Sequence, residues 1–153
     1  MTAWSKGRGL LGPLKPLLGT WRNVSQDDKP ASRAKCTRTF EAALGGGFVR
    51  LSAIWEDVAG PGKHYEEWAL FGRGDDGKLA FWSFTSDGKH SQGSIADGSD
   101  VHPQALSFEA DMPAGRARFS YWPADDDGFH FAVEARTKKG WSRFVLHHYV
   151  PLG

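Results

Sequence analysis

Hydrophobic and polar residues alternate along most of the chain, and turn-forming residues interrupt the alternation at short intervals. Alternation with a period of two is typical of strands that bury one face. A first strand is therefore expected from Gly19-Thr20-Trp21 onward, followed by strands at residues 34–44, 48–55, 63–71, 79–85, 89–96, 105–110, 116–122, 129–136 and 141–150. Turn signals such as Gly45-Gly46-Gly47 and Asp127-Gly128 lie between these segments and favour antiparallel hairpins.

This order of elements predicts an all-β protein, a roughly ten-stranded antiparallel up-and-down β-barrel. No convincing crossover helix separates two strands, which argues against a parallel sheet. A meander of this length has to close, or split into two packed sheets, to protect its edges. We favour closure.

The segment before the first strand is apolar and contains two prolines. Pro13 and Pro16 fix the backbone and remove donors, so at most one helical turn is expected there. Leucines recur near helical spacing and give that turn one apolar side, at positions Leu10, Leu11, Leu14, Leu17 and Leu18. We expect the turn to plug one end of the barrel, in a single domain over residues 1–153 with a loose lead at residues 1–10. An amphipathic turn lying on a β-sandwich is the alternative.

Composition and charge exclude several classes of function. Lys and Arg total 19 and Asp and Glu total 18, which argues against a nucleic-acid partner held by long-range attraction. Cys36 is the single cysteine, so an intramolecular disulfide and a site built on several thiolates are excluded. No apolar window of about 18 residues predicts a membrane span. The N-terminus is a poor signal peptide, so we expect a cytoplasmic protein.

Several expected strands carry large side chains on both faces. In the last strand, Phe144, Leu146 and His148 share one face, while Val145 and His147 share the other. One explanation is a barrel with an aromatic interior and a partly covered exterior. The other is a homodimer that buries part of the outer wall.

The adjacent histidines His147 and His148 face opposite ways in a strand, so only one can point into a cavity. The company of Phe144 and Leu146 favours His148 as the inward one. A neutral imidazole in an apolar pocket can ligate iron or bind a ligand through a hydrogen bond. Both histidines are candidate metal ligands. The alternative is a histidine bonded to a side chain of a neighbouring strand.

A second candidate is the pair His64 and Glu66, which share a strand face. They could act as an acid and a base, or hold the polar end of a ligand. An inward Glu66 would need a partner such as Arg118 to offset the burial of its charge. The alternative is a cross-strand salt bridge on an exposed wall.

Aromatic side chains are the third candidate, because the chain contains seven Trp and ten Phe. They either line a cavity that recognises a flat or apolar molecule or form plain core. The residues that we expect to bind a ligand are Glu66, Trp68, Trp82, Arg118, Phe131 and His148.

The opening Pro13-Leu14-x-x-Leu17-x-Gly19-Thr20-Trp21 resembles that of nitrobindins and of related lipocalin-like bacterial domains of unknown function. The stretch at residues 38–44 and the stretch Tyr65-Glu66-Glu67-Trp68 are similar to the second group. The resemblance implies a ten-stranded calycin-type barrel with a central cavity for a small apolar molecule.

In nitrobindins that molecule is haem, held by a histidine near the C-terminus, so the resemblance makes haem a possible cofactor and His147 or His148 its ligand. The glycine-rich run that nitrobindins carry after the tryptophan is replaced here by Arg22-Asn23-Val24-Ser25.

Four hypotheses for function follow from these observations. The first is a lipocalin-like barrel that binds a small apolar ligand and has no catalytic activity. The second is a haem protein of nitrobindin type. The third is an enzyme that acts on an apolar substrate through His64 and Glu66. The fourth is a homodimeric interaction module whose outer aromatic face is the working surface.

Overall fold

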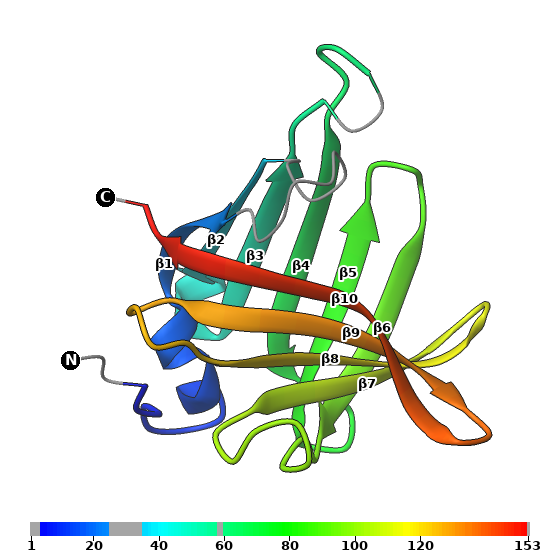
Figure 1. The fold of residues 1–153 in the computed structure, drawn as a ribbon. Coiled ribbons are helices and arrows are strands. Elements are labelled where there is room, and N and C mark those ends of the chain that lie inside the picture. Colours follow the sequence, from blue (N-terminus) through cyan, green and yellow to red (C-terminus); the bar gives the residue numbers. More distant parts are fainter. Residues whose placement is uncertain (1–3, 25–34, 58–59, 153) are drawn as a thin grey trace.

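The protein is a closed barrel of antiparallel strands, seen here in a computed structural model that describes residues 4–24, 35–57 and 60–152 (Figure 1). In these ranges two short 3₁₀ helices accompany ten strands, namely η1 (Gly12–Leu17), β1 (Gly19–Val24), β2 (Cys36–Ala43), η3 (Leu44–Gly46), β3 (Phe48–Trp55), β4 (Tyr65–Arg73), β5 (Leu79–Thr85), β6 (His90–Ala96), β7 (Leu106–Met112), β8 (Gly115–Pro123), β9 (Phe129–Thr137) and β10 (Gly140–Pro151). The predicted fold class is confirmed. The loop expected at residues 25–33 lies outside the described residues.

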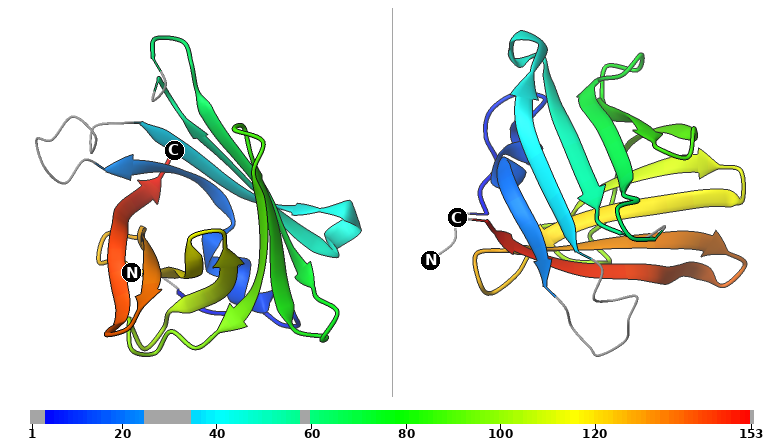
Figure 2. Two further views of the ribbon diagram at one scale, coloured as in Figure 1. Left: turned by 90° about the vertical axis from the view of Figure 1, so that its right-hand side faces the viewer. Right: turned by 90° about the horizontal axis from the view of Figure 1, so that it is seen from above.

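Closure depends on the pairing of β1 with β10. Trp21 lies opposite Pro151, and Val24 lies opposite His148. Every other strand pairs with its neighbours in the sequence, and the left panel of Figure 2 shows the strands surrounding the interior. Because each strand has two partners, no row of backbone donors and acceptors is left at an edge. The arrangement is consistent with a calycin, lipocalin-like fold.

The helix η1 plugs one end of the barrel, as expected. Pro13 occupies its first turn, where a missing N–H costs little. Leu14 and Leu17 are fully buried, and the Trp21 indole Nε1 donates to the Leu17 carbonyl at 2.7 Å. This bond ties the plug to β1. Trp4, within the expected loose lead, also packs against the core.

Aromatic rings fill the barrel above the plug. Trp21 meets Phe129 edge to face at 4.9 Å between centroids, and Phe40 lies 5.8 Å from Tyr121 in a similar arrangement. Such pairs add attraction beyond the burial of apolar area. The plugged end of the barrel is therefore a solid core.

The outer wall is partly covered by other parts of the chain. Arg118 of β8 points outward but is only 3% exposed, because it bonds Glu134 at 2.8 Å and Asp100 at 2.8 Å and lies under the Trp141 ring. Beside it, the hydroxyls of Ser107 and Ser120 share a buried 2.7 Å hydrogen bond. These contacts explain why β7, β8 and β9 carry buried side chains on both faces. In the described ranges, no helix is long and apolar enough to cross a membrane.

We expect Leu17→Ala to lower the free energy of unfolding by about 2–5 kcal/mol, because it leaves a cavity beneath the aromatic core. Equilibrium unfolding in urea measures the change. Leu18→Ala is the matched control, since Leu18 is 44% exposed, and we expect it to cost less than about 1 kcal/mol. Equal costs at the two positions would contradict the plug's role.

Candidate ligand-binding cavity

A cavity of about 380 Å³ occupies the barrel at the end away from η1. The strand register defines the two ends, because β2 pairs Phe40 with Gly19 beside η1 and pairs Cys36 with Trp55 at the opposite end. The cavity includes Trp55 and reaches the turn between β5 and β6 at Lys89. Its volume lies in the lower part of the range for small-molecule sites.

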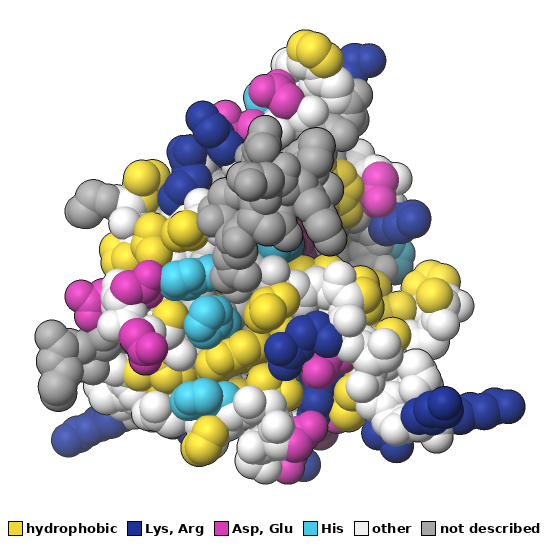
Figure 3. All heavy atoms as spheres, in the orientation of Figure 1, with side chains coloured by type: hydrophobic (Ala, Val, Ile, Leu, Met, Phe, Trp, Pro, Cys, Tyr) yellow, Lys and Arg dark blue, Asp and Glu magenta, His cyan; other side chains and the backbone are white. Residues whose placement is uncertain are grey.

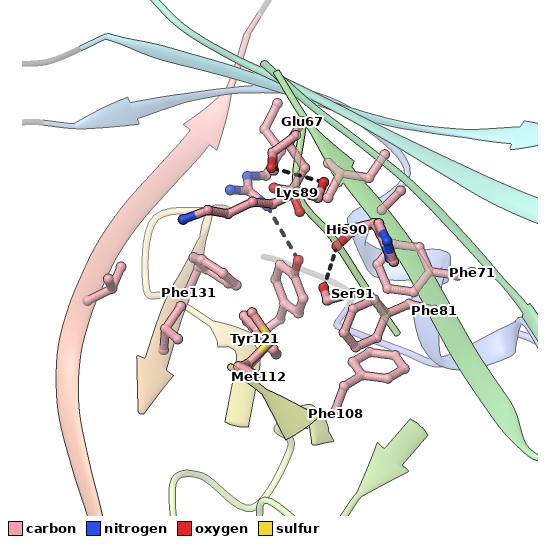
Figure 4. Close-up of a pocket in the computed structure, with 18 of the residues that line it drawn as sticks. Glu67, Phe71, Phe81, Lys89, His90, Ser91, Phe108, Met112, Tyr121 and Phe131 are labelled. Carbon is pink, nitrogen blue, oxygen red and sulfur yellow. Dashed lines mark hydrogen bonds between the residues drawn. The ribbon is translucent and has the colours of Figure 1, made fainter. Parts of the chain in front are cut away.

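Most of the cavity wall is apolar, and Figure 4 shows several of its aromatic rings around one space. Phe71 and Phe81 each lie within 6 Å of Phe108, at centroid distances of 5.4 and 5.6 Å. The other apolar lining residues are Leu51, Trp55, Tyr65, Ala69, Met112, Phe119, Tyr121, Phe131, Val133 and Val145. A wall of this kind suits an apolar molecule.

One permanent cation lies in this apolar setting. Arg38 of β2 is 3% exposed and lines the cavity. Its guanidinium carbon lies 4.6 Å from the centroid of the Phe131 ring and 5.2 Å from that of Tyr149. Its Nη1 donates to the Tyr121 hydroxyl at 3.4 Å, the dashed line that ends at Tyr121 in Figure 4. Its Nε is buried and has no hydrogen-bond partner.

Glu67 of β4 lines the same cavity. Burial raises the pKa of its carboxyl group, and the positive charge of Arg38 opposes that rise. No ion pair joins Glu67 to Arg38, and among the described residues no other carboxylate pairs with this guanidinium. The buried cation and the half-buried acid therefore share a cavity without direct contact.

His147 of β10 also faces the cavity. Burial lowers the pKa of its imidazole, and the charge of Arg38 lowers it further. The ring lies 5.0 Å from that of Trp55, and its Nδ1 is buried without a hydrogen-bond partner. A neutral imidazole with an unpaired, buried Nδ1 is thus part of the cavity wall.

The expected orientation of the histidine pair is reversed in the structure. His148, expected inward, faces out, where its Nε2 lies 3.0 Å from the Asp126 carboxylate and its ring lies 4.8 Å from that of His130. Figure 3 shows histidine side chains gathered on one face of the surface. The neighbours Phe144 and Leu146 did not indicate the interior because both are exposed, at 65% and 43%.

The other expected ligand-binding residues lie in different places. Phe131 is on the cavity wall. Trp68, which is 58% exposed, and Glu66 lie on the outer side of β4. Trp82 is on the outer side of β5 beside Phe48, at 6.5 Å between rings, and Arg118 belongs to the outer network described above.

The expected acid and base pair does not face the cavity. His64 is exposed, and its Nδ1 accepts a hydrogen bond from the Asp57 backbone N–H at 3.3 Å. The Glu66 backbone N–H donates to the Ser86 hydroxyl, and its carboxylate is exposed. In β4 it is Glu67, the next residue, that points inward.

Arg38 and Glu67 are charged cavity residues that the sequence reasoning missed, although a signal for them exists; His147 was expected only as a candidate metal ligand. Arg38 alternates with Cys36 and Phe40, and Glu67 alternates with Ala69, so each is a polar residue on an otherwise apolar strand face. A charged residue in such a position either lines a cavity or needs a buried partner.

The cavity is small for a haem. Its volume of about 380 Å³ lies near the lower end of the roughly 300–1,000 Å³ range of small-molecule pockets, and one end is open, so a haem would be only partly enclosed. Among the described residues, no cluster of three or more His, Cys, Asp or Glu side chains is arranged to hold a metal ion.

No protein-family model matches the sequence, and the search of curated proteins found no significant match. The barrel and the chemistry of its cavity are therefore the basis for a functional proposal.

We expect Glu67→Gln to stabilise the protein increasingly as the pH rises from about 4.5 to 7.5. The pKa of Glu67 is raised in the folded state, so above the unfolded value the folded state binds more protons, and stability falls as the pH rises. Glutamine removes this loss. Thermal unfolding of both proteins across this pH range measures the difference.

Glu66→Gln is the control for this prediction, because it removes an exposed carboxylate from the same strand. A pH trend of the same size in Glu66→Gln would contradict the assignment to the buried side chain.

Proposed function

We propose that this protein binds a small, mainly apolar molecule inside its barrel and acts as a lipocalin-like binding protein. The observation that carries the proposal is the cavity of about 380 Å³ with an aromatic wall above a solid, plugged floor. Protein interiors are normally close-packed, with few voids larger than a water molecule. An unfilled apolar cavity of this size lowers stability, so its presence favours a ligand that fills it.

Under this proposal, Phe71, Phe81, Phe108 and Phe131 contact the apolar part of the ligand. Of the residues expected from the sequence to bind a ligand, Phe131 is the one that we assign to the site. Trp68 and Trp82 are not assigned to the site, because they lie on the outer wall. The cavity has room for at least about a dozen non-hydrogen atoms of a ligand.

A catalytic role for His64 and Glu66 has no support from their positions, since both are exposed outside the cavity. The outer aromatic residues Trp68 and Phe84, which pair across β4 and β5, are the surface that a homodimeric module would use. No contact in the structure favours that use over ligand binding.

We expect the wild-type protein to bind 1-decanol, a neutral apolar probe of suitable size, and Ala69→Phe to weaken that binding at least about tenfold. Ala69 is buried at the cavity wall, so the added ring occupies the volume that the ligand needs. Isothermal titration calorimetry measures both affinities.

Ala42→Phe is the matched control, because Ala42 is an exposed residue of β2. We expect it to bind 1-decanol like the wild type. Thermal unfolding of each variant verifies that it is folded. Absence of binding by the wild type, to 1-decanol and to other apolar molecules of this size, would refute the proposed function.

Haem is the competing ligand that the nitrobindin resemblance implies. We expect hemin to give no saturable shift of its Soret band on titration with the protein, because the cavity encloses only part of a haem. A stoichiometric shift that His147→Ala abolishes would instead support a haem protein.

A further inference from the structure

The least expected feature of the cavity is that its buried cation has no charged partner in contact. Arg38 keeps its positive charge at every accessible pH, and moving such a charge out of water carries a large cost. Buried arginines normally meet a carboxylate in a two-pronged arrangement that uses Nε and the Nη groups. Here the contacts are an Nη1 bond to Tyr121, two aromatic faces, and the neighbouring Cys36 thiol and Tyr149 hydroxyl; none of these groups is a carboxylate, and Nε has no hydrogen-bond partner.

The contrast with Arg118 shows how this chain treats a buried arginine that has a purely structural role. Arg118 is also 3% exposed, but its Nε and both Nη groups bond the carboxylates of Glu134 and Asp100 at 2.8–2.9 Å. Arg118 faces the outer wall, whereas Arg38 faces the cavity. Arg118 therefore has carboxylate partners within the protein, and Arg38 does not.

A second polar group of the cavity wall also lacks a partner. The His147 Nδ1 is buried without a hydrogen bond, whereas the Tyr149 hydroxyl lies beside the Cys36 thiol and Arg38. Lys89 adds a second positive charge at the cavity mouth, so Glu67 is outnumbered among the charged residues that line the cavity. Glu67 does not neutralise Arg38 by direct contact, and a protonated Glu67 carboxyl would donate a hydrogen bond to an acceptor in the cavity.

We propose that the ligand of this cavity is an amphipathic acid, whose carboxylate binds the Arg38 guanidinium and whose apolar body lies against the phenylalanine wall. The inference rests on the proposed function and names the chemical class of the ligand. The Arg38 side chain supplies the fork of donors that a carboxylate fits.

The position of Arg38 along its strand orients such a ligand. The register pairs Arg38 with Ala53 and Ala53 with Glu67, whereas Leu51, Ala69 and Phe71 of the cavity wall lie further toward η1. A carboxylate on Arg38 therefore lies nearer the open end, and the apolar body extends inward toward Phe71 and Phe108. An unbranched acid of about a dozen non-hydrogen atoms fits within this volume.

The test compares decanoate with 1-decanol by calorimetry at pH 7.5, using the full chain. We expect the wild type to bind decanoate at least about tenfold more tightly than 1-decanol, since a charge-assisted hydrogen bond is among the stronger polar contacts. Arg38→Gln should remove this preference by weakening decanoate at least about tenfold and leaving 1-decanol within about twofold. Arg50→Gln, on the outer wall beside Glu41, should leave both affinities unchanged.

The outcomes separate this inference from the proposed function. If the wild type binds 1-decanol and decanoate equally, the carboxylate subsite is wrong and the apolar binding function stands. If no acid or neutral probe binds, both are wrong. Acetate that binds as tightly as decanoate would show a plain anion site and overturn the amphipathic acid.

A second measurement keeps the inference testable if Arg38→Gln fails to fold. In ¹⁵N-labelled wild type, the Nε–H signal of Arg38, identified by its absence from Arg38→Lys, should shift on addition of decanoate and stay in place with an equal amount of acetate. An unchanged signal at saturating decanoate would overturn the proposed contact.

Discussion

The pairing of β1 with β10 is the constraint on which the rest of the molecule depends. A meander closes only when its first and last strands meet, and here Trp21 and Val24 pair with Pro151 and His148. Closure creates an interior, in which the inward side chains of all the strands pack against one another. The plug, the aromatic floor and the cavity above it are all consequences of that closure.

Inside the barrel, the solid core and the cavity occupy different depths. Near η1 the aromatic rings pack against Leu14 and Leu17. Toward the other end the same strands carry smaller residues such as Ala69 and Ser83, and the wall encloses a cavity. Arg38 lines this cavity and is stacked on the Phe131 and Tyr149 rings of the core. One barrel therefore contains a close-packed core at one end and a cavity at the other.

The sequence was sufficient to predict the fold because strand alternation and turn chemistry are local properties. Residues 48–55 and 79–85, expected as strands, coincide with β3 and β5. It was harder to predict which face of each strand points into the barrel, because residues on the outer wall are also buried. Arg118 shows why: its burial comes from Glu134, from Trp141 and from Asp100 of a connecting loop, contacts that only the closed barrel brings together.

The inward residues of the candidate site were assigned wrongly for the same reason, and each assignment was wrong by one position in the strand. A shift of one position exchanges Glu66 for Glu67 and His148 for His147, and each exchange moves the side chain through the wall. The clue that was available, a charged residue between apolar neighbours on one strand face, applies equally to Arg38 and Glu67. The sequence contains that pattern, but its meaning depends on knowing which face is interior.

The burial of Arg38 also has a consequence for how the protein folds during its synthesis. The rings that stack on its guanidinium belong to Phe131 in β9 and Tyr149 in β10, and β10 is synthesised after the other nine strands of the barrel. Until β10 pairs with β1, the guanidinium remains hydrated. The desolvation of this charge therefore coincides with the closure of the barrel.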